Sequence, residues 1–427
     1  MKKMLSLAAM FAALSYASPA FADVTVNVYG TLDAALGDVS HSLSIDPQFP
    51  GSVNPVSPVK KTVPGAAIGL FNGGISPSRV GVKGGADICD GMKVFYTLEE
   101  GFNLPTARVS NAAAFLASNA VIPTTAGANS SVNGQLFNRQ AFVGLSAGDY
   151  GSLAVGRNYA PIYDICLTYD PVQDSGLFSP LGFSGTYGGG GGVSEDARVD
   201  NSLKYTNKFG SFNVSALYKL GGTLGEATAK TAYALSAGFE ESGFGLQASY
   251  QAFYDAIVGA SSAATPNAVD ITNENTSAWM VAAKYKFGAA TLKVGYEQYT
   301  ISSPSDILST TPTLYNYYGQ TVGKVTNFSA TASSRNTQII FGGGDYNFTD
   351  KFNLAAGIYN VSPQSNADGT QLSSSQMFYS LLADYHLTKT LDTYVGLMYA
   401  TYSGSGVPSA TYYQNNCISA VGMRFKF

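Results

Sequence analysis

Residues of opposite character alternate with a period of two through most of this 427-residue chain, and this alternation constrains the fold more than any other feature. Between 279 and 287 the odd positions hold Trp, Val, Ala, Tyr and Phe, whereas Lys284 and Lys286 fall on even positions. The pattern recurs at 212–219 and 391–399. A period of two is the period of a β-strand, so the chain is predicted to be all-β.

The length and spacing of these runs indicate where the strands lie. The runs span roughly 9–13 residues, the length that a tilted strand needs to cross a bilayer, whereas soluble strands average about 5–6. Short turns are expected at 88–91, 147–151, 207–210, 240–243, 287–289, 349–351 and 387–389. Long connections are expected at 38–76, 102–136, 159–198, 220–230, 255–276, 302–334, 362–374 and 403–411. A soluble β-sandwich also shows alternation but has no reason to sort its loops by length, whereas outer-membrane barrels join strands by short periplasmic turns and long external loops.

We therefore expect a 16-stranded antiparallel transmembrane β-barrel. Positions 421, 423, 425 and 427 are Val, Met, Phe and Phe, and Arg424 and Lys426 alternate with them. This last strand is predicted to pair with the first, at 24–36, because an open sheet edge in lipid would leave backbone groups unsatisfied. Composition agrees, since 12% of the chain is charged, with 47 Gly and 28 Tyr. Ordinary globular domains carry about 25% charged residues.

Residues 1–22 have the organisation of a secretory signal peptide. Lys2 and Lys3 precede an apolar segment, and Ala20-Phe21-Ala22 is a predicted cleavage site, so the barrel domain is expected to cover 23–427. A transmembrane anchor is the alternative, but the apolar segment is too short for one. Removing 1–22 takes away two lysines and no acid, which moves the formal net charge from −4 to −6 and argues against a nucleic-acid partner.

Few residues are of the types that hold a metal ion or form disulfides. Three cysteines, Cys89, Cys166 and Cys417, are odd in number and widely spaced, so they do not form a disulfide framework, although one pair stays possible. The two histidines, His41 and His386, are too few for a His-rich metal site. We expect no cofactor and no metal.

Several segments in this order resemble the trimeric general porins of Gram-negative outer membranes, of the β-proteobacterial type. They are NVYGTLDAAL at 27–36, SRVGVKG at 78–84, LEEGFN at 98–103, FNRQAFVGL at 137–145, GSLAVGRNYAP at 151–161 and VDNSLKY at 199–205, together with the terminal Phe427. The resemblance implies sixteen antiparallel strands, a homotrimer with 24–36 and 79–101 at the subunit interface, and a third external loop folded into the lumen. The long first and second loops and the cysteines depart from the family pattern.

Basic residues that face the lumen follow from the alternation. Val80 and Val82 are expected to face lipid or a neighbouring subunit, so Arg79 and Lys83 face the lumen. By the same argument Lys93 and Glu99 face inward. Further inward candidates are Lys204, Asp200 and Arg198, since Leu203 and Tyr205 face outward. Arg139 and Arg157 match family positions, but alternation does not place them, and Arg157 needs a bulge at Gly156 to turn inward.

Acidic residues of the predicted loop at 159–198 are the second half of the candidate site. They are Asp164, Asp170, Asp174, Glu195 and Asp196. Acidic groups on an inserted loop that face basic groups on the wall would set the field of a constriction. The five glycines at 188–192 lack the Lys-Ser/Thr of a phosphate loop and would let the backbone bend closely through the bore. For each charge alone, solvation of a loop or rim is the competing interpretation.

The predicted function is passive diffusion of small hydrophilic solutes and ions through a water-filled, charge-lined pore in contact with outer-membrane lipid and lipopolysaccharide. A solute-specific channel stays open as an alternative. A barrel enzyme is disfavoured: 144–148 matches G-x-S-x-G, but that motif needs a following helix and a histidine partner, and His386 lies near a predicted periplasmic turn. A surface adhesin is disfavoured because no segment is long enough to be a passenger domain.

Overall fold

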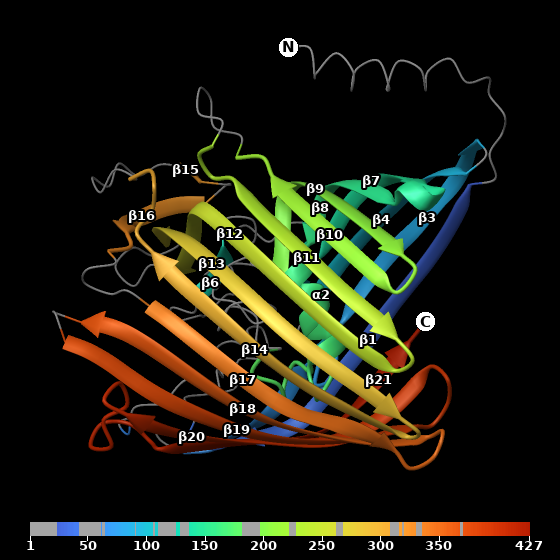
Figure 1. The fold of residues 1–427 in the computed structure, drawn as a ribbon. Helices are drawn as coiled ribbons and strands as arrows, with labels where there is room; N and C mark the ends of the chain where they lie inside the picture. Colours follow the sequence, from blue (N-terminus) through green and yellow to red (C-terminus); the bar gives the residue numbers. More distant parts are fainter. Residues whose placement is uncertain are drawn as a thin grey trace.

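In this computed structural model, sixteen long antiparallel strands form a closed barrel (Figure 1). The structure describes residues 24–41, 61, 65–89, 91–105, 107–109, 125–128, 136–181, 197–221, 228–261, 268–307, 316–317, 320–329, 335–367 and 370–427. The barrel strands are β1 (Thr25–Val39), β3 (Arg79–Cys89), β4 (Met92–Asn103), β7 (Gln140–Ala147), β8 (Ser152–Tyr159), β9 (Arg198–Phe209), β10 (Phe212–Lys219), β11 (Ala232–Glu241), β12 (Phe244–Ser261), β13 (Ala268–Phe287), β14 (Ala290–Ser302), β17 (Arg335–Asn347), β18 (Phe352–Ala367), β19 (Thr370–His386), β20 (Leu391–Gly404) and β21 (Asn415–Lys426).

The last strand closes the barrel on the first, as the alternation predicts. β1 and β21 pair from Thr31 opposite Lys426 to Val39 opposite Ile418. Beyond them, Gly30 and Phe427 exchange two backbone hydrogen bonds, of 3.0 and 3.2 Å. The terminal residue therefore takes part in the ladder, and the sheet has no open edge along this seam.

The second wall strand is interrupted. β2 (Ala67–Asn72) pairs with residues 34–39 of β1, and β3 pairs with residues 25–31 of the same strand. Between them, the carboxylate of Asp33 accepts hydrogen bonds from the backbone N–H groups of Gly74, Ile75 and Ser76, at 3.0, 3.1 and 2.8 Å. Tyr394 of β20 donates its hydroxyl to the same carboxylate. A buried carboxylate thus replaces the strand ladder at this break and satisfies donors that would otherwise be buried unpaired.

All seven predicted short turns are present at one end of the barrel, which we call the turn end; the other is the loop end. Two predicted long connections are wrong. β12 and β13 stay paired as far as Ser261 opposite Val269, and β18 and β19 as far as Ala367 opposite Thr370, so strands run through most of 255–276 and 362–374. No sustained alternation of apolar with polar residues marks these extensions, so the sequence pattern does not reveal the paired backbone.

Short elements add to the barrel. β6 (Thr125–Ala128) pairs with β12, β16 (Gln320–Asn327) pairs with β13 and β15 (Asn316–Tyr317), and β5 (Arg108–Val109) pairs with β4. η3 (Gly148–Tyr150) forms one turn, and α2 (Pro161–Tyr169) lies inside the barrel. Among the described helices, none has the length and apolar character of a membrane span.

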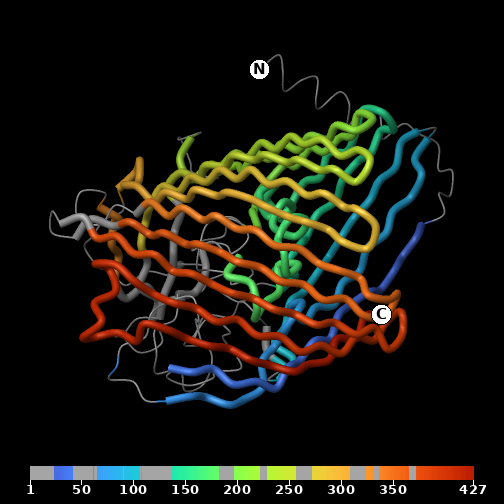
Figure 2. The backbone as a smooth tube through the Cα atoms, turned by 60° about the horizontal axis from the view of Figure 1, so that its bottom comes forward, coloured from blue at the N-terminus to red at the C-terminus, as the bar shows by residue number. Residues whose placement is uncertain are grey.

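The outer face is apolar, as the alternation predicts, but part of the inner face is apolar too. Trp279, Val281 and Tyr285 are exposed on the outside. Tyr359, Phe378 and Met398, from β18, β19 and β20, are fully buried, so they lie on the opposite, inner face. These strands are therefore covered on the inside as well, and Figure 2 shows the chain after β8, in green, running within the ring of strands.

Candidate functional site

The segment 160–181 lies inside the barrel and starts with α2. Pro161 occupies the first helical turn, where its missing N–H costs nothing. The apolar side chains of Ile162 and Ile165 are buried, and α2 packs on the inner faces of β10 to β14. The start of the loop therefore lies against the part of the wall built from β10 to β14 (Figure 1).

Asp170 anchors the loop to the wall. Its carboxylate accepts the hydroxyl of Tyr359 on β18 and the backbone N–H groups of Val172 and Asp174, at 3.2 and 2.9 Å. Lys293 of β14 donates to the backbone carbonyl of Asp170 at 2.9 Å. Burial raises the pKa of Asp170, against the hydrogen bonds it accepts. Asp170 is buried and does not face an open bore, because its carboxylate is used to hold the loop.

Asp174 is buried beside this anchor. Burial raises the pKa of its carboxyl group well above the usual range, and the neighbouring Asp170 raises it further. Hydrogen bonding to Tyr163 and the charges of Arg139 and Arg198 oppose this shift. Asp174 therefore lies near two basic residues of the wall, Arg139 and Arg198, in a buried position.

The second half of the loop is held by packing. Phe178 is fully buried and lies edge-on to Tyr394, with ring centroids 6.4 Å apart. A Cβ at Gly396 would come within 2.5 Å of the Phe178 ring, so only glycine lets the ring approach the wall there. The N–H of Leu177 donates to the carbonyl of Gly74 at 3.1 Å. The loop thus ends against the interruption between β2 and β3.

Weakening the contact between Asp170 and Tyr359 should increase the fluctuations of the open-channel current. Tyr359→Phe removes the hydroxyl that binds Asp170 and leaves the ring, which should cost about 1–3 kcal/mol of loop anchoring. We expect open-channel current fluctuations to increase while barrel assembly is unchanged. Single-channel recordings in planar bilayers check this, with Tyr379→Phe, on the outer face of β19, as the matched control. Equal noise in both variants would contradict the anchor.

A cluster of charged and hydroxyl side chains is centred on Glu99 of β4. The Glu99 carboxylate pairs with Arg139 at 2.7 Å and with Arg79 at 3.6 Å, and accepts the hydroxyls of Tyr29 and Tyr159, both at 2.9 Å. Arg139 and Glu99 side chains are 6% and 5% exposed, whereas Arg79 is 27% exposed. Two guanidinium groups share one carboxylate, so this cluster carries one unbalanced positive charge.

Arg157 follows a bulge at Gly156 on the β9 side of its strand. The register between β8 and β9 shifts between Gly156 and Asn158, and Gly156 has a φ of 140°. A Cβ at Gly156 would lie 2.1 Å from the carbonyl oxygen of Ala141, so the bulge needs glycine. Arg157 is buried, and pairs with Asp200 at 2.6 Å.

The remaining basic candidates are dispersed. Lys204 pairs with Asp164 of α2 at 2.7 Å, which joins β9 to the loop. Lys83 is exposed, with its Nζ 4.9 Å from the centroid of the Tyr29 ring. Lys93 pairs with Asp87 at 3.2 Å at the turn end, and both are largely exposed. Arg198 opens β9 and is half-buried.

Other predicted features lie outside the described residues. They are Glu195, Asp196 and the glycines at 188–192. The sequence reasoning missed Asp33, Tyr359, Tyr394 and Lys293, whose partners are distant in sequence. Asp33 stands between Leu32 and the apolar residues 34–36, and a carboxylate in that run was the signal that could have identified one of them.

A second cluster of charged side chains lies at the turn end. Asp384, His386 and Asp392 lie close enough to hold a metal ion. Arg424 contacts Asp392 at 2.7 Å and Asp384 at 3.3 Å, and Lys426 contacts Asp392 at 2.9 Å. These cations already occupy the carboxylates, so we assign the group to an ion-pair network.

Comparison with known proteins agrees with this architecture. The model of a family described as Gram-negative porin matches residues 6–405. The chain belongs to the Gram-negative porin family. It is 31% identical over 157 residues to an outer membrane porin protein of Bordetella pertussis, which covers 37% of this chain and 33% of that one. Outer membrane porin protein 32 of Delftia acidovorans is 26% identical over 220 residues, 51% of this chain and 49% of that one. The chain thus spans at most about half the length of these relatives.

Solved structures share the fold of this porin. The anion-selective porin from Comamonas acidovorans superposes with a TM-score of 0.62 over 95% of this chain and 100% of that chain, at 15% identity. OmpT of Vibrio cholerae with loop L8 deleted gives 0.61 over 95% and 99%, at 16% identity. At such identities the likeness shows the barrel fold alone. Family membership and the closed barrel together place the chain in the outer membrane.

Proposed function

We propose that this porin is a passive diffusion channel for small hydrophilic solutes and ions. The observation that carries the proposal is the position of the loop 160–181, which lies inside the barrel and is held by several wall strands, while Arg79 stays 27% exposed and Lys83 exposed. Charges on two sides of a narrow aqueous passage orient dipolar solutes and sort ions. Of the predicted loop acids, Asp164 is paired with Lys204 and Asp174 is buried, so Glu195 and Asp196, outside the described residues, are the remaining candidates for the acidic side.

Single-channel recording tests the proposal. Purified full-length protein added to a planar bilayer should give stepwise, ohmic conductance increments that need no energy source. Liposome swelling should show that permeation rates fall with solute size. A protein that inserts, as judged by its heat-dependent gel mobility, but gives no conductance would contradict the proposal.

We propose that the functional unit is a homotrimer whose signal peptide is cleaved after Ala22. Val24, Val26, Val28 and Val80 of the first wall strands are exposed on the outer face and form an apolar surface fit for a neighbouring subunit. One OmpT structure, with a TM-score of 0.54, is described as the trimer form. Chemical crosslinking in mild detergent should give a trimer band, whereas crosslinking that stops at the monomer would contradict it.

We propose no catalysis for the G-x-S-x-G segment at 144–148. Ser146 lies one residue before the end of β7 and is followed by the single turn η3 and by β8, not by the long helix of a nucleophile elbow. His386 donates or accepts a 2.6 Å hydrogen bond with Asp392 at the turn end. Ester hydrolysis by the purified protein would overturn this.

A further inference from the structure

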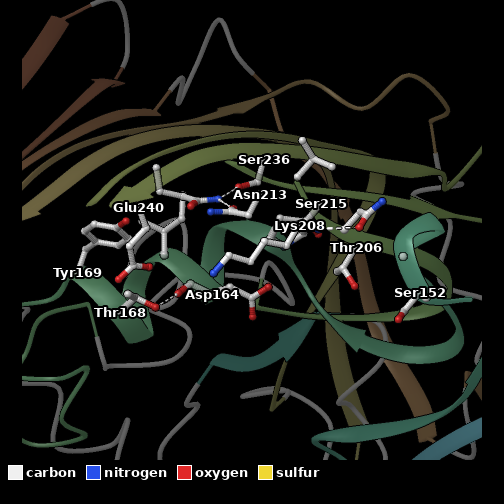
Figure 3. Close-up of a pocket in the computed structure, with 17 residues that line it drawn as sticks. Ser152, Asp164, Thr168, Tyr169, Thr206, Lys208, Asn213, Ser215, Ser236 and Glu240 are labelled. Atoms are coloured by element: carbon white, nitrogen blue, oxygen red, sulfur yellow. Dashed lines mark hydrogen bonds between the residues drawn. The ribbon is translucent and has the colours of Figure 1, made fainter. Parts of the chain in front are cut away.

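Two adjoining cavities lie between α2 and the wall, toward the turn end. The larger has a volume of about 580 Å³, and α2 roofs it with Asp164, Thr168 and Tyr169 (Figure 3). The smaller has a volume of about 190 Å³. Both are lined by Ser152, Thr206 and Asp164, so they meet at these three residues. Their combined size lies within the range of small-molecule sites, about 300–1,000 Å³.

Side chains that both donate and accept hydrogen bonds cover the wall of the larger cavity. Register alignment places hydroxyl residues opposite one another on four neighbouring strands: Ser152, Thr206, Ser215 and Ser236. Closer to the turn end, Gln247 donates to Asn213 at 2.9 Å and to Ser236 at 2.6 Å. Thr206 is exposed and lines both cavities. This surface matches a solute with several hydroxyl groups.

The smaller cavity adds aromatic rings. Phe95 and Phe142 line it and pack edge-on, with centroids 6.0 Å apart, and Tyr159 lines it as well. Two amide side chains, Gln140 and Asn158, lie among these rings. A ring face next to amide groups suits a solute with both C–H and O–H surfaces, such as a sugar.

The charges at the cavities are largely compensated. Asp164 pairs with Lys204 at 2.7 Å, and Glu240 pairs with Lys284 at 2.9 Å. Lys208 is exposed and lies one residue from the β9–β10 turn, where water screens it. The compensated pairs favour a neutral solute over an ion.

We propose that these two cavities form a binding subsite for a neutral polyhydroxylated solute, a monosaccharide or a sugar alcohol. The subsite deepens the proposed channel function, since it would make the pore retain such solutes on their way past α2. Hydroxyl and amide groups exchange hydrogen bonds with the solute in steps along the wall, and the Phe95 and Phe142 rings contact its C–H faces. Retention of this kind would saturate, whereas free diffusion does not.

Binding of the solute to the two cavities can be measured independently of ion conduction. Saturation-transfer NMR on the full-length protein in detergent gives dissociation constants for glucose, sorbitol and gluconate. We expect saturable binding of glucose and sorbitol, and gluconate, which has the hydroxyl chain of sorbitol plus a carboxylate, no tighter than sorbitol. Gluconate bound more than tenfold tighter would assign the site to anions through Lys208 and overturn the proposal.

Variants test the residues. Thr206→Val keeps the shape and removes an exposed hydroxyl, so the dissociation constant for sorbitol should rise about fivefold, the ratio for one hydrogen bond. Phe142→Leu should weaken glucose more than sorbitol, because only glucose presents a ring face. Thr97→Val is the matched control, since Thr97 lies on the wall strand β4 and lines neither cavity.

The outcomes separate this proposal from the channel itself. No saturable binding of either polyol, or equal effects of Thr206→Val and Thr97→Val, would overturn the subsite while conductance persists. Absent conductance with intact polyol binding would overturn the diffusion channel and leave the subsite standing. Heat-dependent gel mobility confirms that each variant is folded.

Discussion

Replacing Arg79 and Lys83 together with alanine should shift the zero-current potential toward cation selectivity. Arg79 is 27% exposed and Lys83 is exposed, whereas Arg139 and Arg157 are buried in ion pairs, so we expect the first two to act on permeating ions. A unit charge 7 Å from an ion in water contributes about 0.6 kcal/mol. Because cations and anions respond in opposite directions, loss of two charges should change the cation-to-anion permeability ratio by roughly threefold or more at low salt.

The measurement is the zero-current potential across a tenfold salt gradient, wild type against the double variant. The difference should shrink in molar salt, where the Debye length falls to about 3 Å. Lys389→Ala, in the turn between β19 and β20, is a control that should change the potential little. Equal potentials for wild type and double variant would show that Arg79 and Lys83 do not set the field.

Replacing Glu99 with alanine should destabilise the barrel and shift selectivity the other way. The change leaves the buried Arg139 guanidinium without its carboxylate, and loss of one partner of a buried pair costs about 3–5 kcal/mol. Two cations then remain without their anion, so the pore should favour anions more than wild type. Glu99→Gln keeps an acceptor for Arg139 and should fold better, with the same shift in selectivity.

The free energy of unfolding of these variants can be measured from the fluorescence of Trp279, the one tryptophan of the chain. Trp279 is 38% exposed on the outer face, so its fluorescence should change when the barrel leaves the lipid during urea denaturation. Glu241→Ala, an exposed carboxylate at the turn end, should change the free energy of unfolding by less than about 0.5 kcal/mol. A Glu99→Ala protein as stable as this control would show that the cluster does not hold the wall.

Much of the barrel could be predicted because alternation is local. The phase of Val80 and Val82 predicted that Arg79 lies on the other face of its strand, where the structure pairs it with Glu99. The aromatic end of the chain predicted the pairing of the last strand with the first. By alternation, Arg157 lies on the same face of its strand as Val155, which faces outward, so a bulge at Gly156 would be needed to turn Arg157 inward. The register between β8 and β9 does shift between Gly156 and Asn158. Each of these inferences needed only neighbouring residues and the side-chain period of a strand.

The loop contacts could not be predicted, because their partners are far apart in sequence. Asp170 meets Tyr359 across 189 positions and Asp33 meets Tyr394 across 361, so no local pattern links them. An acidic residue in a loop is usually solvated, and only the inner apolar surface around Tyr359 and Phe378 makes burial of Asp170 possible. The sequence by itself therefore determined the outer face of the strands that alternate, because the side-chain period is local. Tertiary packing decided which charges hold the loop, because their partners lie far apart in the chain.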